Sequence, residues 1–296
     1  MSESMHTPNR TERGVQTRDG LVLHTVRWDP APHEASGRTF LLVHGLASNA
    51  LMWSGVGSRL AIDGHVVVAV DQRGHGRSSR PGRSFDAELL AEDLRGVIDS
   101  HALDTPVIVG QSWGGNVALD TAHRHPRHAS AVVAVDGGTI DLHASFPDLD
   151  AALEAMRPPR LAGTPFVEIE TGIRERHLRW PEEAIQAALA NFDVRDDGTA
   201  EPRLEFDEHL AILRQMWQQR PSAWFRDLTV PVLLLMVPSG HDEAWAAVKR
   251  EQVSAAQRAG SHVSCRWLDG YDHDLHAQAP DVVVHHVLDW LLEVAR

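Results

Sequence analysis

The stretch PVIVGQSWGGNVALDTAHRH, residues 106–125, carries the strongest local signal in the chain. Its first part predicts a buried strand over 106–112, and residues 114–125 predict a helix. A Gly-x-Ser-x-Gly motif, from Gly110 to Gly114, lies at the junction. A sharp strand-to-helix turn needs neighbours without side chains, and it lifts the serine hydroxyl out of the sheet. The stretch therefore predicts that Ser112 is a nucleophile on a strained turn.

Short apolar runs alternate with helix-length amphipathic segments on both sides of this motif. The runs predict further strands at 21–28, 39–45, 66–71, 130–136, 231–237 and 263–269, and the amphipathic segments predict helices at 51–62, 86–101, 243–259 and 281–295. Most of the runs are rich in Val and Leu throughout, which is typical of parallel strands covered by helices on both faces. The pattern predicts an α/β fold with a doubly wound, mostly parallel sheet.

The alternation stops between Gly137 and about Asp227. This stretch shows helical patterns separated by proline breakers and a DDG turn, and it shows no strand pattern. We therefore expect a helical lid insertion at 138–227 within a core made of 20–137 and 228–296. Residues 1–19 are expected to form a flexible N-terminal segment.

The composition is that of a soluble globular chain. Of the 296 residues, 43% are hydrophobic and 23% are charged, and the net charge of -13 disfavours binding to nucleic acid or to an anionic membrane surface. A single cysteine, Cys265, excludes an internal disulfide and a cysteine-based metal site. No apolar run suggests a signal peptide or a membrane span, so we expect a cytoplasmic protein. The single lysine, Lys249, is interpreted as a coding bias without functional meaning.

Two further segments supply the groups that a serine nucleophile needs. Acyl transfer requires N–H donors for the developing oxyanion, and the loop after the 39–45 strand offers the N–H of Leu46 beside that of Trp113. His44 is interpreted as structural. The serine also needs an imidazole base, and His273 lies a few residues after the last strand. His276 competes for this role but suits packing at the start of the final helix.

Four segments together resemble the landmarks of the α/β-hydrolase family, in the family's order: VHGLASN (43–49), DQRGHGRSS (71–79), GQSWGGN (110–116) and DHDLHAQAP (272–280). The resemblance extends from about Gly20 to Leu292. It implies serine-type chemistry, a structural loop over 71–78, and a lid that shapes the substrate pocket.

The acid of the expected Ser-His-acid triad is the open point. Relatives usually carry it shortly after the strand equivalent to 231–237, but the expected position here holds Ser239 or Gly240. Asp242 follows late and suits a helix cap. Asp136 ends an apolar run, where an unpaired carboxylate would be costly, and two glycines follow it. Asp136 is the favoured acid, and Asp242 stays the alternative.

These residues predict hydrolysis of a carboxylic ester or lactone of a small to medium hydrophobic molecule, with no cofactor and no metal. Ser112 disfavours the dehalogenases and epoxide hydrolases of the fold, which resemble this chain but use an aspartate at the same turn. Carbon–carbon bond hydrolases, cofactor-free perhydrolases and a non-catalytic ligand-binding member remain alternatives. Phe146, Trp217 and Trp224 of the expected lid are candidate pocket residues. The sequence specifies no oligomeric state.

Overall fold

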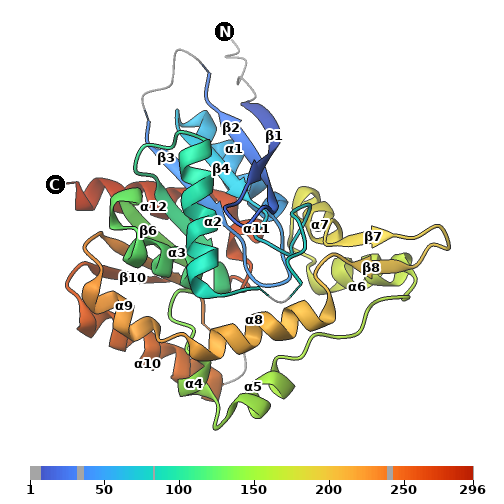
Figure 1. Cartoon of the computed structure of the whole chain (residues 1–296). Helices are drawn as coiled ribbons and strands as arrows, with labels where there is room; N and C mark the ends of the chain where they lie inside the picture. The colour runs from blue at the N-terminus through green and yellow to red at the C-terminus, as the bar shows by residue number, and fades with distance from the viewer. Residues whose placement is uncertain (1–7, 32–36, 83, 239–242, 296) are drawn as a thin grey trace.

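A computed structural model describes residues 8–31, 37–82, 84–238 and 243–295, and its main feature is an eight-stranded sheet. The strand order is β1-β2-β4-β3-β5-β6-β9-β10 (Figure 1). The strands are β1 (Asn9–Gln16), β2 (Val22–Asp29), β3 (Thr39–Val43), β4 (Val66–Val70), β5 (Val107–Gln111), β6 (Ala131–Val135), β9 (Val232–Met236) and β10 (Val263–Trp267).

Six of these strands, β4 to β10 in the sheet order, run parallel, and β1 and β2 pair antiparallel at one edge. The prediction of a doubly wound, mostly parallel sheet is confirmed. Because parallel strands all end at the same edge, the loops after β3, β5, β6 and β10 come together there. The predicted nucleophile, acid and histidine all lie on these loops.

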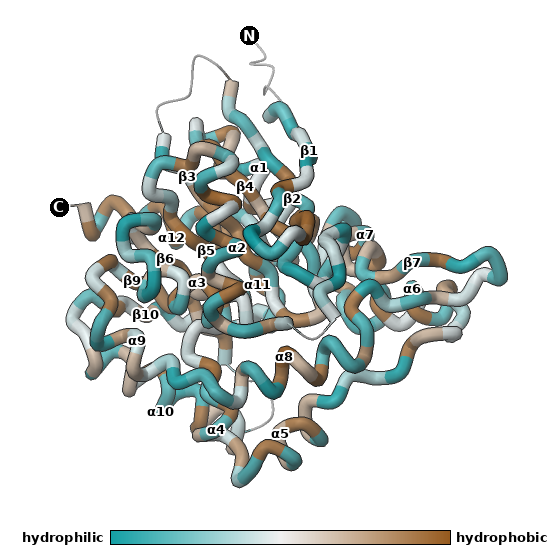
Figure 2. The backbone as a smooth tube through the Cα atoms, viewed as in Figure 1, coloured by the Kyte–Doolittle hydropathy of each residue, from teal (hydrophilic) through white to brown (hydrophobic). Residues whose placement is uncertain are grey.

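Helices cover both faces of the sheet (Figure 1). Side chains on each central strand alternate between two buried clusters: Leu41 and Val43 belong to one, and Phe40 and Leu42 to the other. The first cluster is covered by α2 (Ala87–Ser100), α3 (Trp113–Arg124) and α10 (Glu243–Ala259), and the second by α1 (Ser54–Ile62) and α12 (Pro280–Val294). Hydrophobic segments accordingly gather along the central strands in Figure 2. Burial on both faces explains why the strand sequences are apolar throughout.

The chain between β6 and β9 is mainly helical. It contains α4 (Leu142–Ser145), α5 (Leu149–Ala155), α6 (Phe166–Arg176), α7 (Glu182–Leu189), α8 (Phe206–Gln218) and α9 (Pro221–Asp227). The expectation that this stretch lacks strands is wrong, because β7 (Phe192–Val194) and β8 (Ala200–Pro202) form a hairpin that projects from one side (Figure 1). Each strand has only three residues, too few to show an alternating pattern. Short elements complete the chain: η1 (Ala50–Trp53), η2 (Pro126–His128) and α11 (Leu275–Gln278).

The expectation of a flexible segment over residues 1–19 also needs correction. Residues 9–16 form β1, which pairs with β2 along its whole length. All of its side chains except that of Val15 are exposed. The strand is therefore held by backbone pairing at the sheet edge, and its polar sequence, NRTERGVQ, carries no apolar run that would predict it.

The loop over 71–78 has the structural character that the sequence suggested. The carboxylate of Asp71 accepts hydrogen bonds from the backbone N–H groups of Ala50 (2.6 Å) and Arg77 (2.9 Å). Arg73 is buried and forms two hydrogen bonds with Asp93 on α2, of 2.7 and 2.8 Å. These contacts fix the loop against the sheet edge that carries the candidate site.

The buried pair gives a stability prediction. Arg73→Met should lower the free energy of unfolding by about 3–5 kcal/mol, because it leaves the carboxylate of Asp93 buried without its cation. Arg95→Met is the matched control. Arg95 lies on α2, the helix that carries Asp93, and pairs with Glu92 and Asp99 in partly exposed positions. Its loss should therefore lower the free energy of unfolding by about 1 kcal/mol or less. Urea unfolding of both variants measures the difference. Equal losses would contradict a structural role for the buried pair.

Candidate active site

Ser112 lies on the turn between β5 and α3. Its backbone has φ 52° and ψ −125°, in the left-handed half of conformational space that residues with a side chain rarely adopt. The turn is held by hydrogen bonds from Ser112 N–H to the Val135 carbonyl (3.0 Å) and from Gly115 N–H to the Ser112 carbonyl (2.9 Å). The sharp turn expected from the Gly-x-Ser-x-Gly motif is therefore present.

Neighbouring glycines make this turn possible. A Cβ atom on Gly110 would lie 2.2 Å from the Gly114 carbonyl oxygen, and one on Gly114 would lie 2.4 Å from the His44 carbonyl oxygen. A Cβ atom on Gly137 would lie 2.1 Å from the Ser112 carbonyl oxygen. All three obstacles are backbone atoms, which cannot rotate away. The glycines therefore let the ends of β3, β5 and β6 approach the start of α3.

Asp136 is the first residue after β6, and Ser112 is the first residue after β5. Because Gln111 and Val135 are paired in the sheet, the two residues leave it side by side. It also has a positive φ, 45°. Its side chain is buried, and Oδ1 accepts a hydrogen bond of 3.0 Å from the N–H of Val237 at the end of β9. The carboxylate is therefore held at the junction of three strands.

His273, in the loop between β10 and α11, contacts this carboxylate. Its Nδ1 lies 2.6 Å from Asp136 Oδ2, and because a carboxylate only accepts, Nδ1 carries the proton. Nε2 of the neutral ring is then unprotonated and can accept a hydrogen bond or a proton. The side chain of His273 is about half exposed (53%). Its partial desolvation opposes protonation, but the bond to Asp136 and the charges of Asp274 and Asp136 outweigh this effect and raise its pKa. Burial likewise opposes ionisation of Asp136, whose pKa is nevertheless lowered by His273 and Lys249.

The structure thus brings together Ser112, Asp136 and His273, the last two in direct contact. The alternative acid, Asp242, lies outside the described residues. His276 is fully buried in α11, where its ring packs 4.4 Å from that of Trp53 and burial lowers its pKa to about 3. A neutral buried ring of this kind fits the packing role rather than that of the base.

The segments that carry the two expected oxyanion donors, Leu46 and Trp113, both lie next to Ser112. Trp113 is the first residue of α3, so its N–H has no partner within the helix. A Cβ atom on Gly45 would lie 3.1 Å from Ser112 Cβ, which places the loop carrying Leu46 beside the serine. The fully buried His44 fixes this loop: Nδ1 contacts the Gly45 carbonyl (2.7 Å) and Nε2 accepts from Gln72 N–H (3.0 Å).

A cavity of about 570 Å³ opens over these residues. Ser112, Asp136 and His273 line it together with a mainly apolar set: Ile140, Met156, Met236, Val237, Pro238, Trp245 and Val248. Phe146, Trp217 and Trp224, the aromatic residues expected to contribute to the pocket, do not line it. They pack against the hydrophobic core instead, and Trp217 contacts His143 (5.0 Å between rings) while Phe146 contacts Trp245 (6.0 Å).

Sequence reasoning missed the contribution of α10. Trp245, Val248, Lys249 and Gln252 all line the cavity. Their spacing of three and four residues puts them on one helix face, so the signal was present in the sequence. Lys249 lies 2.6 Å from Asp136 Oδ1 and was interpreted as having no function. The sequence does not show that this face of α10 lies opposite the ends of β6 and β9.

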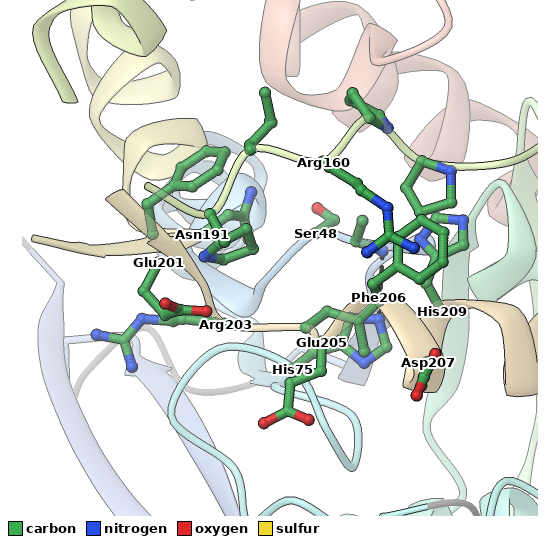
Figure 3. A pocket seen from close by; sticks show the side chains of 18 of the residues that line it. Ser48, His75, Arg160, Asn191, Glu201, Arg203, Glu205, Phe206, Asp207 and His209 are labelled. Carbon is green, nitrogen blue, oxygen red and sulfur yellow. Dashed lines mark hydrogen bonds between the residues drawn. The ribbon is translucent and has the colours of Figure 1, made fainter. Parts of the chain in front are cut away.

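A second cavity, of about 410 Å³, lies between the loops at 47–48 and 75–76 and the segments 158–162 and 201–209 (Figure 3). Two of its acidic side chains pair with arginines, Glu205 with Arg80 (2.6 Å) and Glu201 with Arg195. Arg160 lies over the ring of Phe206, 3.9 Å from its centre. None of the three triad candidates is among its lining residues, so the first cavity is the candidate active site.

Within the described ranges, no group of three or more His, Cys, Asp or Glu residues is arranged to hold a metal ion. The same part of the chain contains no helix long and apolar enough to cross a membrane.

Comparison with known proteins agrees with the fold described above. The sequence model of the alpha/beta hydrolase fold family matches residues 38–165. A solved structure of E-2-(acetamidomethylene)succinate hydrolase superposes with a TM-score of 0.77 at 23% identity, covering 96% of this chain and 99% of that one. The chain therefore has the α/β-hydrolase fold, as the sequence motifs implied.

Similar curated proteins differ in the reaction that they are named for. The chain is 25% identical to the 2-(acetamidomethylene)succinate hydrolase of Mesorhizobium japonicum, over 87% of this chain and 89% of that protein. It is 26% identical to the esterase YbfF of Escherichia coli, over 90% and 98%. It is 35% identical to epoxide hydrolase B of Mycobacterium tuberculosis, but only over 52% and 46%.

The turn at Ser112 gives a second stability prediction. Gly110→Ala should destabilise the protein by about 1–3 kcal/mol or more, because the new methyl group meets backbone atoms that cannot yield. Gly96→Ala, in the middle of α2, is the control: nothing lies within 4 Å of its added Cβ, so we expect a gain of roughly 0.5–1 kcal/mol. Thermal unfolding of both variants is the measurement. A Gly110→Ala protein as stable as the parent would show that the turn is looser than described.

Proposed function

We propose that this hydrolase cleaves a carboxylic ester or lactone of a small to medium hydrophobic molecule through an acyl-enzyme on Ser112. The contact between His273 Nδ1 and Asp136 Oδ2 is the observation that carries the proposal. It fixes the tautomer in which Nε2 is free to take a proton, and the buried carboxylate stabilises the imidazolium that forms. An imidazole so arranged beside a serine on a strained turn is the arrangement that nucleophilic catalysis requires.

In the proposed first step, Ser112 Oγ attacks the substrate carbonyl carbon while His273 Nε2 accepts the hydroxyl proton. The negative charge that develops on the carbonyl oxygen is stabilised by the N–H groups of Leu46 and Trp113. Collapse of this intermediate breaks the bond to the alcohol, which leaves with the proton from His273. The acyl group then remains on Ser112.

In the second step, water attacks the acyl-enzyme, with His273 again accepting the proton. The same two N–H groups stabilise the second oxyanion, and the acid product leaves as Ser112 regains its proton. Every proton is returned within the cycle, so side chains and water suffice for the proposed reaction.

The lining of the first cavity supports the proposed substrate class. Its walls are mainly aliphatic and thioether side chains with one indole, that of Trp245, which favours an apolar group beside the reacting carbonyl. Met156 and Ile140 come from the segment 138–227, and we propose that this segment acts as the lid that shapes the pocket. Phe146 contributes indirectly, by packing against Trp245.

A second candidate is cleavage of a bond other than a carboxylic ester. The similarity over 87% of the chain to a protein named 2-(acetamidomethylene)succinate hydrolase favours this candidate. Both candidates use the same nucleophile, and an ester assay separates them.

Hydrolysis of a p-nitrophenyl ester series of increasing acyl length tests the proposal. The wild type should turn over the short and medium esters, and Ser112→Ala should fall to the background rate. Asp136→Asn should lose activity by about 10³–10⁴-fold, because the imidazole loses its carboxylate and its preferred tautomer. Asp242→Asn, which changes the alternative acid, should stay within a few fold of the wild type.

Two outcomes would contradict parts of this account. Loss of activity with Asp242→Asn but not with Asp136→Asn would overturn the assignment of the acid. A folded wild type that turns over none of the esters would overturn the ester proposal and favour the second candidate.

A further inference from the structure

Lys249 is the single lysine of the chain, and it is directed at the candidate acid. Its Nζ lies 2.6 Å from Asp136 Oδ1 and donates a 2.8 Å hydrogen bond to the carbonyl of Val237. Its side chain is only 15% exposed. A long, flexible side chain held at both contacts and largely buried is fixed in position, unlike a solvated surface lysine.

The carboxylate of Asp136 is consequently bound on both oxygens. Oδ1 contacts the Nζ of Lys249 and accepts a hydrogen bond from the N–H of Val237, and Oδ2 accepts one from the Nδ1 of His273. Rotation of the carboxylate about its Cβ–Cγ bond would break contacts on both sides at once. Lys249 and Val237 contact Oδ1 only, but by holding Oδ1 they also determine that Oδ2 is the oxygen that faces the imidazole.

We propose that Lys249 is a positioning residue of the triad: it binds Asp136 Oδ1, neutralises part of the carboxylate's charge, and so limits how strongly Asp136 stabilises the imidazolium of His273. This inference rests on the proposed serine mechanism. It adds a residue from α10, a helix that packs against β10 and α9, to a constellation otherwise built from strand-end loops.

The charge of Lys249 has a second consequence. A cation bound to Asp136 weakens the carboxylate's attraction for the imidazolium, so less of the histidine is protonated at a given pH. Without Lys249, the full charge of Asp136 would favour the imidazolium. The pKa of His273, already raised above its usual value, would then rise further, and the neutral base would form only at higher pH.

Other groups around His273 do not replace this effect. The carboxylate of Asp274 raises its pKa together with Asp136, and Lys249 opposes both. Asp272 pairs with Arg179 (3.2 Å). The remaining titratable groups nearby are His177, which interacts with Asp274, His276, which is neutral and buried, and Tyr271. Among the described residues that act on His273, Lys249 supplies the positive charge nearest to Asp136.

An NMR titration of His273 in the full-length protein tests the inference. Ring-labelled histidine is used, and the His273 signal is assigned by its loss in His273→Gln. In Lys249→Met the pKa of His273 should rise by roughly one unit, equivalent to tenfold less neutral base below the midpoint. Lys249→Arg keeps the charge and should stay close to the wild type. Arg250→Met removes the same charge from an exposed neighbour on α10, and should leave the pKa unchanged.

An unchanged His273 pKa in a folded Lys249→Met protein would overturn the inference. So would a rise in Lys249→Arg as large as that in Lys249→Met, because the charge would then not be its cause. The titration needs no turnover, so failure of the ester assay and failure of this inference are distinguishable.

The single lysine gives a second measurement, which does not depend on a Lys249 variant that folds. Lysine labelled at Cε and Nζ yields one side-chain signal in this chain. In the wild type this signal should shift with the same midpoint as His273, and in Asp136→Asn the shift should disappear. A lysine signal that changes neither with pH around the His273 midpoint nor on substitution of Asp136 would show that Lys249 is not coupled to the triad.

Discussion

The pairing of β5 with β6 determines where the reacting groups of this protein lie. Because Gln111 is opposite Val135, the two strands end at the same height, and Ser112 and Asp136 leave the sheet side by side. The next pair outward, Val135 with Leu235, brings the N–H of Val237 to Asp136 Oδ1. A shift in register by one residue would move Asp136 to the opposite face of the sheet. The whole site therefore depends on the register of three parallel strands.

The strand ends are strained where the site is built. Ala47, Ser112 and Asp136, which are not glycines, all have positive φ angles, of 56°, 52° and 45°. Such conformations cost on the order of 1–3 kcal/mol each and persist only where the surroundings enforce them. Here buried strands on both sides supply that enforcement. Strain directly after β5 and β6, and in the loop that follows β3, fits a site in which geometry is kept at the expense of stability.

Local signals predicted most of this architecture. The strand–turn–helix stretch around Ser112, the apolar strands and the position of His273 after the last strand are all readable within a few residues. Asp136 could be singled out because a carboxylate at the end of an apolar run needs a partner. The β7–β8 hairpin and the edge strand β1 were missed because short or fully exposed strands leave no hydrophobic pattern.

Contacts between distant segments were beyond the sequence. An amphipathic helix does not reveal whether an aromatic side chain faces the core or a cavity, so Trp217 and Trp224 could not be separated from Trp245. Lys249 is 113 residues away from Asp136 along the chain, and its role emerges only when α10 is placed beside β9.

The central claim is that Ser112 is activated by a histidine that Asp136 holds in place. The most direct test is the rate of covalent labelling by a fluorophosphonate, with the labelled peptide identified by mass spectrometry, in the wild type and in Asp136→Asn. The account predicts rapid labelling confined to Ser112 in the wild type and labelling slower by orders of magnitude in the variant. A wild type that resists the reagent, or equal rates in the two proteins, would contradict it.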